Sequence, residues 1–355
     1  MIGNKQPLAL LLTDTHLNRD NVDLNKSIFR QAIMKAKEYG FAHIYHKGDI
    51  FDSRLNQSLR TLLAFKSILN DFKEHNITLR AIPGNHDKVD YESDRSYLDV
   101  YSDHPNFELY STPTLLKLSD DIDVCLVPYY KETTIYKQKL DSILPRVKKK
   151  TVLLTHCALS GVRNNDGSLM GERETPPMES FDVFEKIFVG HYHNAQALDN
   201  GRIVYPGSSM PHNYGEDNEK GIVLVYNNLS WQHLKTDFPH YIKVQFDVKE
   251  DDPKAFIETK QQLKESDHFR IEVIGTSAEI QAFDKNIFTK HGIDVKKKNQ
   301  EIETNITMVQ EVAFESHTAA SITKEFDVFC KKNKITKADK QIGDKYIKRL
   351  ENVEF

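Results

Sequence analysis

The feature that most constrains the fold is a regular alternation of short apolar runs and amphipathic helical stretches in the first ninety residues. Residues 7–14 and 41–49 are typical of buried strands, and residues 25–39 between them carry apolar side chains at helical spacing. Residues 58–75 repeat the helical pattern, and residues 77–87 form a third strand that ends in a turn. Strands that alternate with helices of this length predict βαβ units and a parallel sheet.

Shorter strand candidates follow between residues 106 and 235. They predict a second sheet that packs on the first, with helices outside both. We therefore expect an α/β protein built as a four-layer α/β/β/α sandwich.

The pattern changes near residue 239. Residues 241–300 follow a β-α-β-α-β order, which predicts a small α+β domain that is separable from the first, residues 1–240. Residues 301–327 carry six acidic residues and one lysine, whereas residues 331–349 carry eight basic and two acidic residues. We interpret residues 301–355 as a linker followed by a pair of helices.

Composition excludes several classes of protein. A hydrophobic content of 39% excludes wholesale disorder, and a formal net charge of −4 over 355 residues argues mildly against a nucleic-acid coat protein. Three widely spaced cysteines predict neither a disulfide framework nor a cysteine-based zinc site, which favours the cytoplasm. The apolar run at residues 8–12 is too short for a signal peptide or a membrane span.

Five short motifs each follow a strand-like run, and each is rich in aspartate, asparagine or histidine. They lie at residues 14–16 (DTH), 48–52 (GDIFD), 84–87 (GNHD), 155–156 (TH) and 190–193 (GHYH). Because α/β proteins place their sites at the carboxyl ends of strands, we expect the five to converge. Oxygen and nitrogen donors without thiolate favour Mn²⁺, Fe²⁺ or Zn²⁺ over a lone Mg²⁺ or Ca²⁺.

Such a set of donors is also suited to two metal ions. A carboxylate at a rigid turn can bridge two ions that activate a water and stabilise a phosphoryl transfer, while a further histidine serves as general acid. We expect Gly48, Gly84 and Gly190 to let the backbone turn sharply behind the ligands.

The motifs resemble those of the SbcD family, calcineurin-like metallophosphoesterases that are the nuclease subunits of DNA double-strand-break repair complexes in cells and phages. The resemblance rests on GDIFDSR, IPGNHD, LLTHCALSG, VGHYHNAQ and the segment YPGSSMPHNYGEDNEKG, and it spans residues 8–226. The C-terminal helices resemble more loosely those with which phage members dock on their partner ATPase.

The resemblance implies a role for each motif residue. The expected ligands are Asp14, His16 and His193 for the first metal, Asn85, His156 and His191 for the second, and Asp49 as the bridge. His86 is expected to protonate the leaving 3′ oxygen or to steady the scissile phosphate, with Asp52 orienting its imidazole.

The resemblance also implies a metal-dependent DNA exonuclease and endonuclease that uses two-metal hydroxide attack, with Mn²⁺ favoured and Mg²⁺ also considered. The expected substrates are double-stranded DNA ends and hairpins in recombination and repair. The expected partners are an SbcC-type coiled-coil ATPase and a second copy of the chain, with residues 241–300 capping the site. A phosphomonoesterase or nucleotide phosphodiesterase of the same superfamily, and a non-catalytic scaffold, are the alternatives.

Four basic residues near the motifs are candidates for contact with DNA phosphates: Arg19, Arg54, Lys88 and Arg163. The competing interpretation is solvated surface charge, which is the usual state of lysine and arginine. His43 and His46 are expected to have core or sheet-face roles, and His212 either lines the substrate groove or stabilises a loop.

Overall fold

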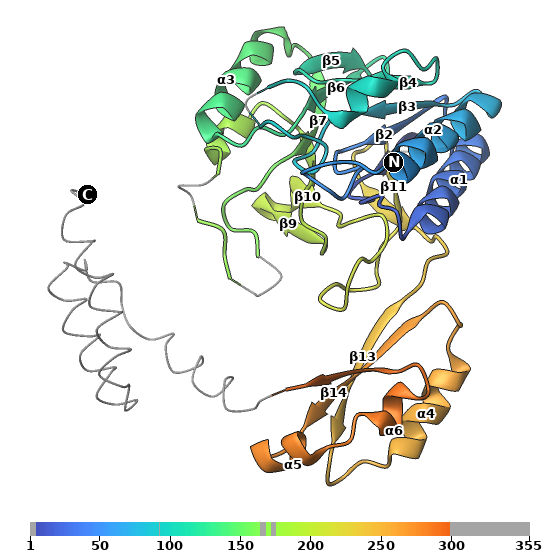
Figure 1. Ribbon diagram of the computed structural model, residues 1–355. Helices are drawn as coiled ribbons and strands as arrows, with labels where there is room; N and C mark the ends of the chain where they lie inside the picture. Colours follow the sequence, from blue (N-terminus) through green and yellow to red (C-terminus); the bar gives the residue numbers. More distant parts are fainter. Residues whose placement is uncertain (1–4, 92, 164–167, 172–174, 299–355) are drawn as a thin grey trace, which may run out of the picture. The chain divides into compact units, whose positions relative to one another are not determined.

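The computed structural model describes residues 5–91, 93–163, 168–171 and 175–298 (Figure 1). Two six-stranded sheets form the centre of the larger part of the molecule. The first has the order β12 (Trp231–Leu234), β11 (Ile222–Tyr226), β1 (Pro7–Leu12), β2 (His43–His46), β3 (Thr78–Ala81) and β4 (Phe107–Leu109). The second has the order β5 (Thr114–Lys117), β6 (Ile122–Val127), β7 (Lys150–His156), β8 (Lys186–Gly190), β10 (Ile203–Tyr205) and β9 (Gln196–Leu198).

The first three strands, β1 to β3, are parallel, as the sequence predicted. Strands β1 to β4 run in one direction, and so do β6, β7, β8 and β10. Antiparallel neighbours at the sheet margins, such as β11 beside β1 and β5 beside β6, make both sheets mixed. An α/β fold with mixed sheets is thus confirmed.

Helices α1 (Val22–Tyr39) and α2 (Leu59–Glu74) connect the first three strands. The buried face of α1 repeats at helical spacing through Ile28, Ala32 and Ala36, and the helix ends at Gly40, whose φ of 74° suits glycine. Helix α2 begins at Ser58, whose side chain accepts a hydrogen bond from the Thr61 amide.

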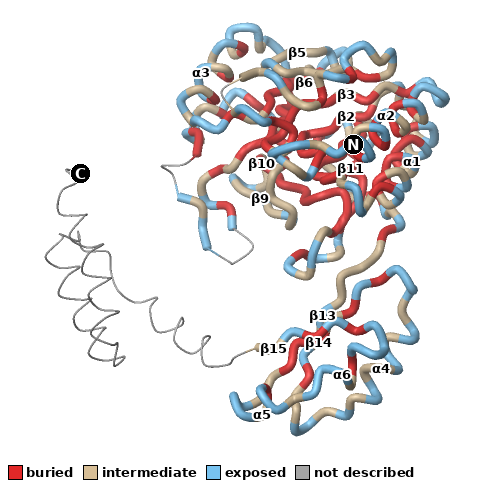
Figure 2. Tube along the Cα trace, viewed as in Figure 1, coloured by how far each residue is buried: buried red, intermediate tan, exposed pale blue. Residues whose placement is uncertain are grey.

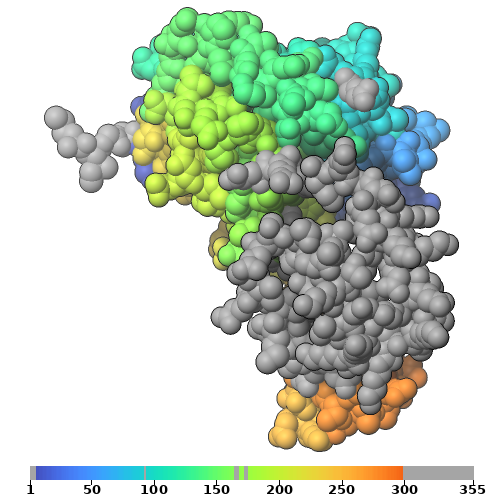
Figure 3. Space-filling model, turned by 90° about the vertical axis from the view of Figure 1, so that its left-hand side faces the viewer, coloured from blue at the N-terminus to red at the C-terminus, as the bar shows by residue number. Residues whose placement is uncertain are grey.

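Three hydrophobic clusters define the layers. One lies between α1, α2 and the first sheet, one between the two sheets, and one between the second sheet and α3 (Thr133–Ile143). Strand β1 alternates accordingly, since Leu10 faces the helices and Leu11 faces the second sheet. Burial follows the strands of both sheets in Figure 2, and the green segment that contains α3 lies at the surface in Figure 3.

Short 3-10 helices complete the connections at Tyr97–Tyr101, Leu144–Arg146, Met178–Phe181 and Asp199–Gly201. None of the helices in the described ranges is long and apolar enough to cross a membrane.

The chain divides into two compact units, and both six-stranded sheets lie in the first. A third sheet has the order β13 (Tyr241–Asp247), β14 (His268–Ile274) and β15 (Asp294–Lys297), with helices α4 (Pro253–Gln262), α5 (Ser277–Ala282) and α6 (Asn286–Thr289). This order follows the predicted β-α-β-α-β pattern, except that two short helices, α5 and α6, replace the single second helix. The division between the two units runs through this sheet. The predicted linker and C-terminal helices, from residue 301, lie outside the described residues.

Candidate metal centre

The five motifs follow strands β1, β2, β3, β7 and β8, so both sheets contribute. Backbone hydrogen bonds join the first two loops, because the Asp14 amide donates to the Gly48 carbonyl (3.0 Å) and the His16 amide to the Asp49 carbonyl (3.1 Å). The first two loops therefore lie side by side at the carboxyl ends of β1 and β2, where α/β proteins place their sites.

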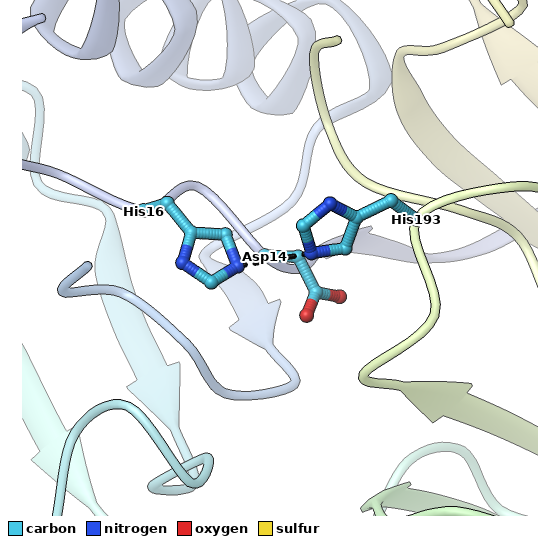
Figure 4. A group of neighbouring side chains, drawn as sticks. All are labelled: Asp14, His16 and His193. Carbon is cyan, nitrogen blue, oxygen red and sulfur yellow. Dashed lines mark hydrogen bonds between the residues drawn. The ribbon is translucent and has the colours of Figure 1, made fainter. Parts of the chain in front are cut away.

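Asp14, His16 and His193 form the first group of potential ligands (Figure 4). The Nε2 atoms of the two imidazoles lie 3.0 Å apart. Their Nδ1 atoms face carboxylates: His16 lies 3.4 Å from Asp52, and His193 lies 2.9 Å from Glu216. If each Nδ1 carries the proton, two Nε2 lone pairs face each other beside a carboxylate, an arrangement that suits a cation.

Asp49, His156 and His191 form the second group, and Asn85 lies between the two imidazoles. The Asn85 Oδ1 is 2.9 Å from both His156 Nε2 and His191 Nδ1. With the amide reversed, its nitrogen would instead donate to both rings. With Oδ1 inward, and once His156 has lost its proton, three acceptors face one point, which again suits a cation.

Asp49 belongs to both halves of the cluster. Its Oδ2 is 3.3 Å from His156 Nε2 and 3.8 Å from His16 Nε2, while its Oδ1 accepts a hydrogen bond from the His86 amide. Burial would raise the pKa of Asp49, but His156 and His16 hold it well below its ordinary value. In turn, Asp49 raises the pKa of His156 to about 9 against the opposing effect of burial.

The glycines of the motifs are required mainly because neighbouring atoms lie too close to leave room for a side chain. Gly48 has a φ of 96°, as expected for a sharp turn, but Gly84 and Gly190 do not lie in the left-handed region. A Cβ atom at Gly190 would lie 2.7 Å from His156 Nδ1, and one at Gly84 would collide with Asp49. The expected reason, a sharp turn of the backbone, was therefore wrong for Gly84 and Gly190. At these two positions it is contact with a proposed ligand that excludes a side chain.

Several proposed ligands have strained backbones. Positive φ angles occur at Asp14 (49°), His16 (44°), Asp49 (57°) and His191 (105°). Non-glycine residues adopt this region at a cost, and such strain concentrates at functional sites. The clustering supports a functional origin for the loop geometry.

His86 is held by the Asp52 residue through an unexpected atom. Its Nδ1 forms a short hydrogen bond to the Asp52 backbone carbonyl, while the Asp52 carboxylate faces His16. Arg54 lies on the other side of the ring, with its guanidinium 2.9 Å from His86 Nε2. Burial lowers the pKa of His86, and the charge of Arg54 acts in the same direction.

The remaining basic candidates are placed differently. Arg19 is exposed and pairs with Asp20 at 3.4 Å, and the exposed Arg163 joins Gln196 through its backbone. Lys88 is fully buried, and its ammonium donates to backbone carbonyls. A DNA-contacting role does not fit the position of Lys88.

Asp87 is a residue to which the motif pattern assigned no role. It is fully buried, and its carboxylate accepts hydrogen bonds from the amides of Gly84, Asp49, Ile50 and Phe51. It thereby fastens the second motif to the third. Its position as the last residue of the GNHD motif was the feature of the sequence that could have indicated this role.

Glu216 and His212 also support the ligands. Buried Glu216 accepts hydrogen bonds from His193 Nδ1 and from the Ser208 hydroxyl. His212 lines the cleft above the cluster, and its Nε2 donates to the Asp14 carbonyl at 2.8 Å. His212 therefore lines this cleft and also stabilises the loop of the first motif.

His46 and Lys47 are buried directly below the ligands. His46 lies 3.1 Å from the Thr15 hydroxyl, and burial lowers its pKa to about 3, in keeping with the expected core role. The Lys47 ammonium donates to the Val189 carbonyl across the two sheets. These contacts brace the strand ends.

A family model described as calcineurin-like phosphoesterase matches residues 8–195, which is more than half of the chain. Exonuclease subunit 1 of Enterobacteria phage T4 is 24% identical over 233 residues, 61% of this chain and 65% of that protein. The SbcD component of the nuclease SbcCD of Staphylococcus epidermidis is 23% identical over 311 residues, 79% of this chain and 78% of that protein. The DNA double-strand break repair protein Mre11 of Saccharolobus solfataricus is 28% identical over 211 residues, 55% of this chain and 52% of that protein.

The chain thus spans less than two thirds of the phage and archaeal relatives. These matches confirm the resemblance to the SbcD family that the motifs indicated.

Proposed function

Because this chain belongs to the calcineurin-like phosphoesterase family, we propose that it is a DNA nuclease that hydrolyses phosphodiester bonds at DNA ends and hairpins during recombination and repair. The observation that carries the proposal is the convergence of carboxylate, amide and imidazole donors from five loops, with His86 and Arg54 beside them. The names of the three relatives, all of them nuclease or break-repair proteins, support DNA as the substrate.

The donor set fits two divalent cations, for which we favour Mn²⁺ and consider Mg²⁺. One ion would be held by Asp14, His16 and His193. The other ion would be held by Asn85, His156 and His191, and Asp49 would contribute to both. When bound, the ions would acidify a water and neutralise charge on the phosphate.

His86 and Arg54 would act on the substrate itself. The guanidinium of Arg54 can pair with a phosphate oxygen, and the His86 Nε2 lies at that same point. In the free protein the low pKa of His86 favours the neutral ring. A phosphodiester anion beside Nε2 would favour its protonated form, and Nε2 could then donate that proton to the leaving 3′ oxygen.

Cleavage of linear and hairpin DNA by the purified chain in Mn²⁺, with and without the ATPase, tests the proposal. Asp49→Asn should lose both Mn²⁺ binding and cleavage. His86→Ala should keep Mn²⁺ binding, measured by calorimetry, while its cleavage rate falls roughly 10²- to 10⁴-fold. His75→Ala, an exposed histidine at the end of α2, is the matched control and should be unaffected. Full activity of His86→Ala, or no cleavage of any DNA by the wild type, would count against the proposal.

The rival activity is a phosphomonoesterase or nucleotide phosphodiesterase with the same ligands. A nuclease should hydrolyse hairpin DNA and bis-(p-nitrophenyl) phosphate in preference to p-nitrophenyl phosphate. Faster release of p-nitrophenol from the monoester, p-nitrophenyl phosphate, would favour the phosphomonoesterase.

A partner ATPase and a cytoplasmic location complete the proposal. One relative is, by its name, one component of the nuclease SbcCD. We assign ATPase docking to the basic segment at residues 331–349, which lies outside the described residues. Truncation after Val309 should abolish co-purification with the ATPase and leave Mn²⁺ binding intact. Retained co-purification would exclude this assignment.

We also propose a homodimer through the start of α2. Leu55, Leu59 and Leu63 are 86%, 70% and 55% exposed, and the last two share one helix face. Exposed apolar side chains that adjoin one another favour a protein contact. Leu59→Glu with Leu63→Glu should yield a monomer in light scattering, whereas Val100→Glu, at an exposed valine elsewhere, should not. A monomeric wild type would exclude the dimer.

A further inference from the structure

Two tyrosines beside the metal centre have no role in the chemistry above. The Tyr129 ring lies nearly parallel to that of His191, with centroids 6.3 Å apart and an interplanar angle of 20°. It meets the rings of His156 and Tyr91 edge-on, at 6.1 and 5.7 Å. Both tyrosines are half-buried, so part of each residue is accessible to solvent.

The backbone around these rings is fixed by the buried lysine that does not fit a DNA-contacting role. The Tyr129 amide donates to the Pro83 carbonyl at 3.0 Å, and the Tyr129 carbonyl accepts from the Lys88 ammonium at 2.9 Å. Lys88 also donates to the Ser93 carbonyl at 3.2 Å, close to Tyr91 in the chain. One ammonium therefore holds together the two segments that carry the rings.

Positive charge lies next to the same rings. The Lys131 ammonium is 5.9 Å from the centre of the Tyr91 ring, and Lys131 is exposed. Burial raises the pKa of Tyr129 to about 12, and the positive charge of Arg54 acts in the opposite direction. A rigid aromatic surface flanked by cations is the arrangement with which proteins hold single-stranded nucleic acid.

We propose that Tyr129 and Tyr91 form a stacking platform for an unpaired nucleobase next to the scissile phosphate. The inference rests on the proposed nuclease function and deepens it, because it requires the strand to be unpaired where it is cut. A frayed end or a hairpin loop supplies such a base without cost, whereas an intact duplex must first be opened. Stacking tolerates any base, so the platform selects strand structure and not sequence.

The platform is tested with single-stranded oligonucleotides in which one nucleotide at a time, near the cleaved bond, is replaced by an abasic tetrahydrofuran residue. Loss of one stacked base should weaken binding by the wild type roughly 5- to 100-fold at one position, measured by fluorescence anisotropy. The rate of single-turnover cleavage in Mn²⁺ should show the same preference. Tyr129→Ala should bind intact and abasic strands equally, while Tyr129→Phe should keep the preference.

The ratio of the affinities for the intact and the abasic strand is independent of the fraction of a variant that is folded, because both affinities are measured on the same protein. Tyr39→Ala, at the far end of α1, is the matched control and should keep the wild-type ratio. Equal binding of both strands by the wild type, or an unchanged ratio in Tyr129→Ala, would overturn the platform. If Tyr129→Ala binds Mn²⁺ more weakly but keeps the ratio of intact to abasic binding, Tyr129 only positions His191 and the platform is excluded. Absence of cleavage on every DNA would refute the nuclease, and the binding ratio would still decide the platform.

Discussion

Replacement of Asp87 by alanine should destabilise the protein more than any other single change outside the hydrophobic core that we consider. Its carboxylate accepts hydrogen bonds from four backbone amides, three at Oδ2 and one, from Phe51, at Oδ1. Each buried donor left without a partner costs about 1–1.5 kcal/mol at the lower end of the usual range, so Asp87→Ala should lose about 4–6 kcal/mol. That is a large part of a normal free energy of unfolding.

Asparagine at the same position provides the sharper comparison. With its oxygen at the Oδ2 position, Asp87→Asn keeps three acceptor contacts and leaves the Phe51 amide facing an NH₂ group. Its cost should be about 1–3 kcal/mol, clearly less than that of alanine.

Urea unfolding in EDTA, followed by circular dichroism, measures both variants without a contribution from metal binding. Asp71→Ala, which removes a surface pair with Arg30, serves as the control and should cost at most about 1 kcal/mol. The reasoning fails if Asp87→Ala costs less than about 1 kcal/mol, or if asparagine is as damaging as alanine.

Three further predictions concern metal and DNA. Glu216→Gln should weaken Mn²⁺ binding roughly 10- to 100-fold in calorimetry, because the carboxylate no longer orients His193; unchanged affinity would contradict that role. In the metal-free protein the pKa of His156 is raised from 6.5 to about 9, so the stability due to its pairing with Asp49 is complete below pH 6.5 and is lost as the pH rises through about 9. Mn²⁺ must displace that proton, so its apparent affinity should rise over the same interval, and a flat profile would show that His156 is not a ligand. Arg54→Ala should reduce the salt dependence of DNA binding by about one phosphate contact, whereas Lys88→Met should lower stability and leave the salt dependence unchanged; a reduced slope in Lys88→Met would restore its role in DNA contact.

The sequence predicted those parts of the fold that depend on local periodicity. Alternation of strand and helix patterns gave β1, α1, β2, α2 and β3 in their parallel arrangement, because each pattern reports which face of an element is buried. It also predicted that the motifs converge, because parallel strands of one sheet share a carboxyl edge, whereas packing of the two sheets brings β7 and β8 beside β1, β2 and β3.

Roles that depend on contacts between distant residues were less accessible. Asp52 was expected to orient the His86 imidazole, and only the structure showed that its backbone carbonyl contacts that ring while its carboxylate faces His16. Both interpretations of Lys88, contact with DNA phosphates and solvated surface charge, required an exposed ammonium, yet two backbone carbonyls bind it in the interior. A side chain's direction and burial follow from packing, which composition does not report.

The sequence by itself determined which chemical groups this protein brings to its site, because aspartate, asparagine and histidine at strand ends identify themselves by type and spacing. Only the tertiary structure decided how these groups are held. Asp87 and Glu216 act on residues that come from other loops, and their hydrogen bonds exist only once those loops lie side by side. The sequence specifies the types of donor group, whereas the packing of the sheets determines the orientation, tautomer and neighbours of each donor.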